Sequence, residues 1–236
     1  FEDIQAVVYD KDGTLASSEA FLRNLAQRRA RLIDAQIPGV QEPLLMAFGL
    51  EGNQIHPAGL MAVGTRWENE IAAAAYVAET GRGWAEALQI VHSSFAEADR
   101  YMPPKSDQTP LIPGAIELLQ RLDQAAIKLA ILSSDSAENV EAFVNHSSLQ
   151  SYFKAICGVD PQYVTKSDPQ LLSQLFKMLE VPPAQSLLIG DSQLDVQIAK
   201  AAGMAGCISF LGGWSSNFSI ADATSTVHRF DEIVVG

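Results

Sequence analysis

The order of apolar and polar positions divides the chain into three parts. Residues 4–9 form a short apolar run typical of a buried parallel strand. From residue 113 onward, similar runs alternate with amphipathic helical segments, which predicts a parallel sheet with right-handed crossovers. The stretch 16–109 shows helical spacing and turns rich in Gly and Pro. Because the strand at 4–9 has no partner nearby in sequence, we expect it to join the later sheet.

The predicted fold class is therefore α/β, with a Rossmann-like parallel sheet core and an inserted all-helical subdomain. We assign residues 1–15 and 110–236 to the core and residues 16–109 to the insertion. The expected later strands are 128–133, 154–158, 185–190 and 205–210, with a last edge strand at 226–230. The expected core helices are 113–124, 137–145, 168–180 and 195–202. In the insertion, helices are expected after Ser17 or Ser18, at 67–79 and at 84–99.

Composition and charge narrow the class of protein. A hydrophobic fraction of 47% and a charged fraction of 19% over 236 residues are typical of a soluble globular protein. The net charge of -12 argues against nucleic acid or an anionic membrane as the main partner, because both require a basic face. We expect no signal peptide, and no apolar run approaches the roughly 20 residues of a membrane span. Cys157 and Cys207 form no zinc or disulfide pattern, so we expect buried thiols and a cytoplasmic protein.

Two acids stand at the end of the first strand, in Asp10-Lys11-Asp12-Gly13-Thr14. Ligands of parallel sheets bind beyond the carboxyl ends of the strands. Residues two apart in an extended segment point the same way, so Asp10 and Asp12 are candidates for one cavity, where a cation would relieve their repulsion. The alternative is a solvated turn, where Asp and Gly are common. A calcium-binding EF-hand is a poor match, because Gly13 is fourth from Asp10 rather than sixth.

Further polar residues follow the later strands. Ser133 and Ser134 end one strand, Asp191 and Asp195 follow another, and Lys166 precedes a helix. Singly, each has a structural explanation, such as a backbone hydrogen bond, a surface lysine or a helix cap. Jointly, acids at one rim suit Mg²⁺, and a hydroxyl with an ammonium suits the oxygens of a transferring phosphoryl group.

These motifs resemble the haloacid dehalogenase superfamily of aspartate-nucleophile phosphohydrolases. Its signature D-x-D-G-T matches residues 10–14, its strand ending in Ser or Thr matches 131–133, its Lys-x-x-Pro matches 166–169, and its G-D-S-x-x-D matches 190–195. The helical insertion resembles the C1-type cap of the phosphoglycolate phosphatase and β-phosphoglucomutase branch. The resemblance implies a fold with the site at the strand ends and a cap that closes over a small phosphorylated metabolite.

The resemblance also implies catalytic roles. Asp10 is expected to be the nucleophile that forms an aspartyl-phosphate. Asp12 is expected to protonate the leaving alkoxide and then to deprotonate the attacking water. Dehalogenases of the family lack this second acid, so its presence favours phosphoryl chemistry over carbon–halogen cleavage. Lys166 is expected to offset the charge of Asp10 and of the phosphoryl group.

Ligand roles follow from the same resemblance. Ser133 is expected to bind phosphoryl oxygens with help from the backbone of Ser134. Asp191 is expected to hold Mg²⁺ together with the Asp10 carboxylate and the main-chain carbonyl of Asp12. Asp195 is expected to order the waters of the metal or Lys166.

Lys11 departs from the family pattern, which usually has an apolar residue there. A structural role, such as packing on the sheet or pairing with an acid, is favoured over binding of an anionic substrate. The insertion has no recognisable specificity motif, and Arg66, His56 and Asn69 are its polar candidates.

Three functions are compatible with these residues. The favoured one is a Mg²⁺-dependent phosphatase of a small phosphorylated metabolite. A phosphomutase of the β-phosphoglucomutase type would use the same residues and differ in its product. A non-catalytic binding module is disfavoured by the intact set of acids and lysine, although fold alone would not decide.

Overall fold

The central feature of the fold is a six-stranded parallel sheet with the strand order β5-β4-β1-β6-β7-β8. We describe a computed structural model that covers residues 1–159, 165–216 and 218–235. The strands are β1 (Ala6–Tyr9), β4 (Lys128–Leu132), β5 (Phe153–Cys157), β6 (Ser186–Gly190), β7 (Gly206–Phe210) and β8 (Ser225–Val227). The N-terminal strand β1 joins the later strands, as the sequence predicted, and lies between β4 and β6.

Helices cover both faces of the sheet, so the central strands β1, β4 and β6 are buried on two sides. Val7 and Tyr9 of β1 pack against α7 (Ala115–Gln124) and α8 (Ala137–His146) in one hydrophobic cluster. Ala6 and Val8 face a second cluster that contains α9 (Pro169–Leu179) and α10 (Gln193–Ala201). This alternation explains why the strand is apolar at successive positions rather than at every second one. The α/β class with a parallel sheet is therefore confirmed.

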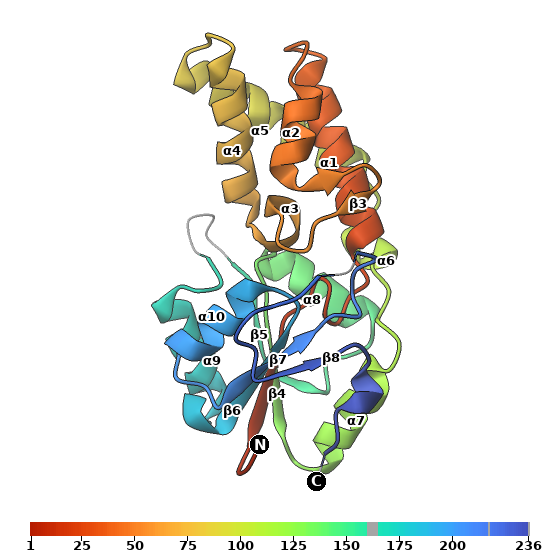
Figure 1. The fold of residues 1–236 in the computed structure, drawn as a ribbon, viewed down its shortest axis with the longest axis vertical. Helices are drawn as coiled ribbons and strands as arrows, with labels where there is room; N and C mark the ends of the chain where they lie inside the picture. The colour runs from red at the N-terminus through yellow and green to blue at the C-terminus, as the bar shows by residue number, and fades with distance from the viewer. Residues whose placement is uncertain (160–164, 217, 236) are drawn as a thin grey trace.

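The insertion forms a third hydrophobic cluster of its own, above the carboxyl ends of the strands (Figure 1). Its helices are α1 (Glu19–Asp34), α2 (Gln41–Phe48), α3 (Leu60–Val63), α4 (Arg66–Glu79), α5 (Trp84–Tyr101) and α6 (Lys105–Gln108). The chain segments that enter and leave it are paired, since Ser17 N donates to Pro110 O at 2.8 Å and Ile112 N donates to Leu15 O at 2.8 Å. The division at residues 15–16 and 109–110 stays a prediction.

The prediction of an all-helical insertion was wrong in one place. Strands β2 (Leu50–Glu51) and β3 (Gln54–Ile55) form an antiparallel hairpin. Its two-residue loop is Gly52-Asn53, and Gly52 has a φ of 60°. Gly-Asn is a favoured hairpin loop because glycine adopts positive φ without strain. The strands are too short for their alternation to stand out in a stretch rich in Gly.

The C-terminal segment differs slightly from the expectation. Strand β8 ends at Val227, and a short 3-10 helix, η2 (Phe230–Glu232), follows it. The Phe230 ring is buried and stacks on Phe210 with ring centroids 4.3 Å apart. Another 3-10 helix, η1 (Pro183–Gln185), precedes β6.

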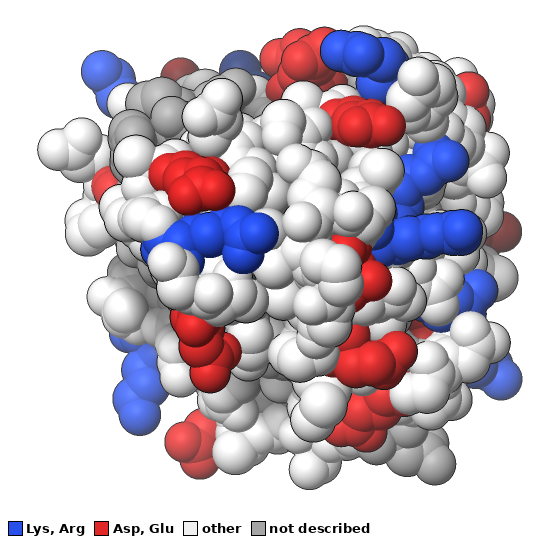
Figure 2. Space-filling view, turned by 90° about the horizontal axis from the view of Figure 1, so that it is seen from above, with Lys and Arg blue, Asp and Glu red and all other residues white. Residues whose placement is uncertain are grey.

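The surface and the thiols fit the composition. On the face seen from above, Lys and Arg alternate with Asp and Glu among many uncharged residues (Figure 2). Among the described residues, every helix is too short or too polar to cross a membrane. Cys157 and Cys207 are buried and free, as predicted, and burial raises the pKa of Cys157 to about 11.

Phe95 tests whether the insertion depends on its own core. Its ring is fully buried and packs edge-on against Phe48. We expect Phe95→Ala to lower the free energy of unfolding by about 3–5 kcal/mol, because it leaves a large cavity. Urea unfolding would measure the change. Trp84→Ala, on the same helix at a side chain with 48% exposure, is the control. Equal effects of the two substitutions would contradict the assignment of a separate core.

Candidate active site

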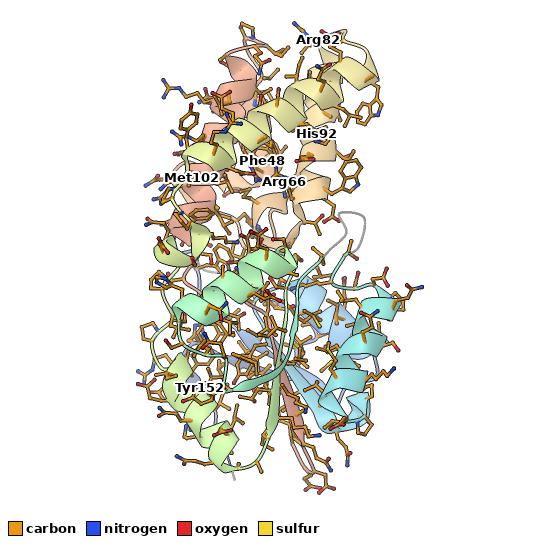
Figure 3. All side chains as sticks on the ribbon, turned by 180° about the vertical axis from the view of Figure 1, so that it is seen from behind. Phe48, Arg66, Arg82, His92, Met102 and Tyr152 are labelled. Carbon is orange, nitrogen blue, oxygen red and sulfur yellow. The ribbon has the colours of Figure 1, made fainter. Side chains whose placement is uncertain are left out.

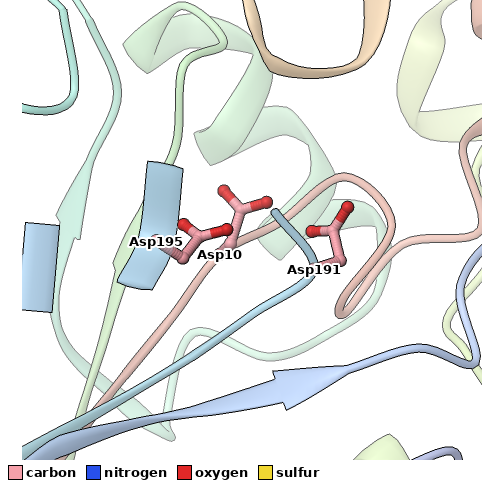
Figure 4. A group of neighbouring side chains, drawn as sticks. All are labelled: Asp10, Asp191 and Asp195. Atoms are coloured by element: carbon pink, nitrogen blue, oxygen red, sulfur yellow. The ribbon is translucent and has the colours of Figure 1, made fainter. Parts of the chain in front are cut away.

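Three buried acids converge where the central strands end. Asp10 directly follows β1, Asp191 directly follows β6, and Asp195 lies in the first turn of α10. One carboxylate oxygen from each lies within 4.8 Å of the others (Figure 4). Neighbouring strands of a parallel sheet end at the same edge, so the pairing of β1 with β6 brings these segments together.

Asp195 approaches the strand end because residue 190 is glycine. A Cβ atom on Gly190 would lie 2.3 Å from the Asp195 carboxyl carbon. The Asp195 Oδ2 atom accepts hydrogen bonds from Ser192 N at 3.0 Å and from Ser192 Oγ at 2.6 Å, which closes the first turn of α10 as a capping box. The helix cap therefore fixes Asp195 and leaves its Oδ1 atom for another partner.

That partner is Lys166, which is buried beside two of the acids. Its Nζ atom donates to Asp195 Oδ1 at 2.7 Å and to Asp10 Oδ1 at 3.0 Å. Burial alone would lower the pKa of Lys166, but the Asp10 and Asp195 carboxylates outweigh burial and raise it. Lys166 is therefore an ammonium at neutral pH, held between the ends of β1 and α10.

One ammonium does not balance three carboxylates. Burial raises the pKa of Asp191 well above its usual range, and the charges of Asp10 and Asp195 add to this effect. Burial also raises the pKa of Asp10, against the opposing effect of Lys166. A divalent cation would relieve this repulsion, and ligands that are all carboxylate oxygens fit a hard cation such as Mg²⁺.

Asp191 is oriented by two donors. Thr14 Oγ1 donates to Asp191 Oδ1 at 2.8 Å, and Trp214 Nε1 donates to Asp191 Oδ2 at 2.6 Å. Thr14 belongs to the recognised signature, whereas the sequence analysis missed Trp214. Trp214 follows the last central strand in Gly212-Gly213-Trp214, and only the fold brings it to Asp191.

Asp12 lies outside this acid cluster and belongs to a second charged group. Its Oδ1 atom accepts from Lys11 Nζ at 2.7 Å and also from the Ser18 hydroxyl, and its Oδ2 atom accepts from Lys105 Nζ at 2.7 Å. Asp135 Oδ2 pairs with the same two lysines, at 3.1 Å from Lys11 and 2.6 Å from Lys105. Burial alone would raise the pKa of Asp12, but Lys105 and Lys11 outweigh burial and lower it.

The side chains of Asp10 and Asp12 separate because the strand ends before them. Strand β1 stops at Tyr9, and the backbone then turns, with the Lys11 carbonyl accepting from the N–H groups of the next residues, Thr14 to Ala16. Gly13 supports the turn with a φ of 80°. The alternation of an extended strand therefore does not apply past residue 9.

Lys11 has a buried position and pairs with acids. Its side chain is 1% exposed, and its Nζ atom also lies 5.7 Å from the centroid of the Phe143 ring. This contact set fits the structural role that the sequence favoured. Lys105 was missed, because its sequence context is a polar linker between two Pro-rich segments.

The two serines at the end of β4 differ in their contacts. Ser133 is buried, and its Oγ atom accepts from Asp135 N at 3.2 Å. Ser134 Oγ donates to the carbonyl of Val63 at 3.0 Å, which joins the core to the insertion.

A cavity of about 590 Å³ lies between the core and the insertion. Asp12 and Ser134 line its core side, and Lys105, Arg66 and Asn69 line the side of the insertion. Arg66 sits at the end of the insertion nearer the core, whereas Arg82 lies at the far end (Figure 3). His56 is the third polar candidate of the insertion. In the part of the chain that the structure describes, it is not one of the residues that line this cavity.

Comparisons with known proteins agree with this geometry. Residues 4–203 match the family described as haloacid dehalogenase-like hydrolase. Phosphoglycolate phosphatase of Pseudomonas syringae pv. tomato is 31% identical over 92% of this chain and 72% of the relative. The chain spans about half of the enzyme of the same name from Pseudomonas savastanoi pv. phaseolicola, with 34% identity over 58% of this chain and 47% of the relative.

A solved structure matches nearly the whole chain. A predicted phosphoglycolate phosphatase from Haemophilus somnus superposes with a TM-score of 0.69 over 98% of this chain and 97% of the other. Its identity of 19% supports likeness of fold alone.

Lys11→Met tests the second charged group. The substitution leaves the Asp12 and Asp135 carboxylates with one ammonium in a buried place. We expect the free energy of unfolding to fall by about 3 kcal/mol. This is the lower end of the range for breaking a buried ion pair, because Lys105 still neutralises part of the charge. Urea unfolding would measure it, with Lys200→Met at an exposed helix position as the control. A loss no larger than that of the control would show that Lys11 contributes no net stability.

Proposed function

The chain belongs to the haloacid dehalogenase-like hydrolases and is a phosphatase, and on this premise we propose that it is a Mg²⁺-dependent enzyme that hydrolyses a small phosphorylated metabolite through an aspartyl-phosphate. The observation that carries the proposal is the buried group of Asp10, Asp191 and Asp195 with Lys166 at the strand ends. Such a group has an excess of negative charge, which a bound cation would neutralise. The cation and the ammonium of the lysine would then both stabilise the phosphoryl group.

We assign the nucleophile to Asp10. Its carboxylate oxygen would attack phosphorus while the bond from phosphorus to the ester oxygen breaks. The ammonium of Lys166, 3.0 Å from Asp10 Oδ1, would offset charge on the transferring phosphoryl group. The contact of Lys166 with the helix cap at Asp195 would keep this ammonium in place.

We assign general acid and base chemistry to Asp12. Its carboxyl group lines the cavity that would receive the leaving group, 2.7 Å from the ammoniums of Lys11 and Lys105. It would give a proton to the departing oxygen and then take one from the water that hydrolyses the aspartyl-phosphate. The lowered pKa of Asp12, which Lys105 and Lys11 hold down against burial, favours the carboxylate form that the second step requires, so the proton given in the first step would have to be taken up when the negatively charged substrate binds.

We assign cation binding to the carboxylates of Asp10 and Asp191 and to the main-chain carbonyl of Asp12. When bound, Mg²⁺ would neutralise charge on the phosphoryl oxygens. Asp195 is assigned a supporting role, because its two oxygens already accept from Lys166 and Ser192.

We assign phosphate binding to Ser133, Ser134 and Lys166. Ser133 is buried at the end of β4, beside the strand that carries Asp10. Because the Ser134 hydroxyl is directed to the Val63 carbonyl, Ser134 would contribute its backbone N–H.

The substrate class is a small phosphorylated carbon compound. The 590 Å³ cavity is of the size of a small-molecule site, and the similar proteins named phosphoglycolate phosphatase make short phosphorylated acids the first compounds to test. A phosphomutase would use the same residues, and release of free phosphate distinguishes the two. We also propose a reducing compartment, the cytoplasm, because both cysteines are free.

Asp10→Asn tests the nucleophile. We expect release of phosphate from a panel of metabolite phosphates to fall to background, because an amide cannot form the acyl phosphate. Circular dichroism would check that the variant is folded, and Asp123→Asn at an exposed position is the control. Activity retained in Asp10→Asn would contradict the assignment.

Removal of the cation tests its role separately. We expect excess EDTA to stop phosphate release from the parent protein and added Mg²⁺ to restore it, because the buried acids would otherwise repel the phosphoryl group. The measurement is the initial rate before and after the additions. A rate unchanged by EDTA would refute the proposed cation.

A further inference from the structure

A short segment after β7 contacts the acid cluster at Asp191. We call residues 212–215 the tryptophan arm, because Trp214 is its central side chain. The indole is 7% exposed, and its Nε1 atom donates to Asp191 Oδ2 at 2.6 Å.

The tryptophan arm packs closely against the turn formed by residues 10–14. A Cβ atom on Gly13 would lie 2.5 Å from Trp214 Nε1 and 2.5 Å from Asp191 Oδ2. A Cβ atom on Gly213 would lie 1.7 Å from the carbonyl oxygen of Gly13. Glycine at both positions is therefore required for the indole to reach Asp191.

The tryptophan arm also packs against and hydrogen-bonds to the insertion. The Trp214 ring is part of the hydrophobic cluster formed by the inserted helices, although its backbone belongs to the core. Ser215 N and Ser215 Oγ donate to the two carboxylate oxygens of Glu19 at 2.8 and 2.7 Å. Gln54 of the hairpin also donates to Ser215 Oγ, at 3.3 Å. The arm therefore contacts Asp191 on one side and α1 on the other.

We propose that Trp214 is a positioning residue that fixes the Asp191 carboxylate for cation binding and couples the cation site to the docking of the inserted helices. This inference rests on the proposed role of Asp191 in holding Mg²⁺.

The physical reason is the directionality of the carboxylate lone pairs. Thr14 and Trp214 each occupy one lone pair of Asp191, one on each oxygen, so the carboxylate cannot rotate without losing two hydrogen bonds. The remaining lone pairs are then presented to the cluster in a fixed orientation. Loss of a donor that orients a metal ligand typically weakens metal binding about 10- to 100-fold.

Mg²⁺ binding by isothermal titration calorimetry tests the positioning role. We expect Trp214→Phe, which keeps an aromatic ring but removes the N–H donor, to raise the Kd for Mg²⁺ about tenfold or more. Trp84→Phe, at a half-exposed position of the insertion, should leave the Kd unchanged. A folded Trp214→Phe protein with the Kd of the parent would overturn the inference.

A measurement on the unaltered protein covers the case in which Trp214→Phe does not fold. The three tryptophans give three ¹⁵N-indole resonances, and single substitutions of Trp67 and Trp84 assign that of Trp214. We expect Mg²⁺ to shift the Trp214 indole signal, because its acceptor oxygen belongs to a cation ligand. A Trp214 signal that stays unchanged at saturating Mg²⁺ would overturn the positioning role.

Glu19→Ala tests the coupling, because Glu19 holds the arm without taking part in the acid cluster. Coupling is reciprocal, so a looser arm should weaken Mg²⁺ binding, by less than Trp214→Phe does. An unchanged Kd in Glu19→Ala would overturn the coupling. A parent protein that binds no Mg²⁺ would instead overturn the proposed function, and with it this inference, so the two failures are distinguishable.

Discussion

The mutual repulsion of carboxylates buried at one edge of the sheet is the constraint on which the site depends. Asp10, Asp191 and Asp195 have only Lys166 as a buried counter-charge among the described contacts, so the cluster keeps an excess of negative charge. Burial and the neighbouring negative charges raise the pKa of Asp191, because both disfavour its charged form. Hydrogen bonds from Thr14 and Trp214 hold Asp191, and those from Ser192 and Lys166 hold Asp195. The uncompensated charge of these buried carboxylates costs stability.

The second charged group behaves differently because its charges balance. Asp12 and Asp135 face the ammoniums of Lys11 and Lys105, two charges of each sign, and both acids have a pKa lowered by the lysines against burial. A balanced group has no need of an added cation. It instead fixes the segment that leaves the insertion to the segment that follows β1, so the same buried region holds one group suited to bind a ligand and one suited to hold the chain.

The features of the fold and site that depend on local sequence pattern and on strand order could be predicted from the sequence. The parallel sheet, and the meeting of Asp10, Lys166 and Asp191, follow from apolar runs and from the polar residues after them. Lys105 and Trp214 were not predictable as partners of the site, because no local pattern marks them. Lys105 contacts a residue 93 positions away, and Trp214 reaches Asp191 only through the turn after β7. The Gly52-Asn53 hairpin had a recognisable signal, but its strands have only two residues each.

The segments that follow β1 and β4 contact the insertion directly, and the segment that follows β6 contacts it through Trp214 of the core. After β1, Asp12 bonds Lys105; after β4, the Ser134 hydroxyl bonds the Val63 carbonyl; after β6, Asp191 bonds Trp214, whose ring is buried among the inserted helices. Asp12, Lys105 and Ser134 line the cavity, so the inserted helices cannot move away from the core without breaking a hydrogen bond of a residue at its wall. Substrate access and the orientation of the site are therefore linked by the same few hydrogen bonds. In the proposed reaction, docking of the insertion would both order the reacting groups and exclude bulk water.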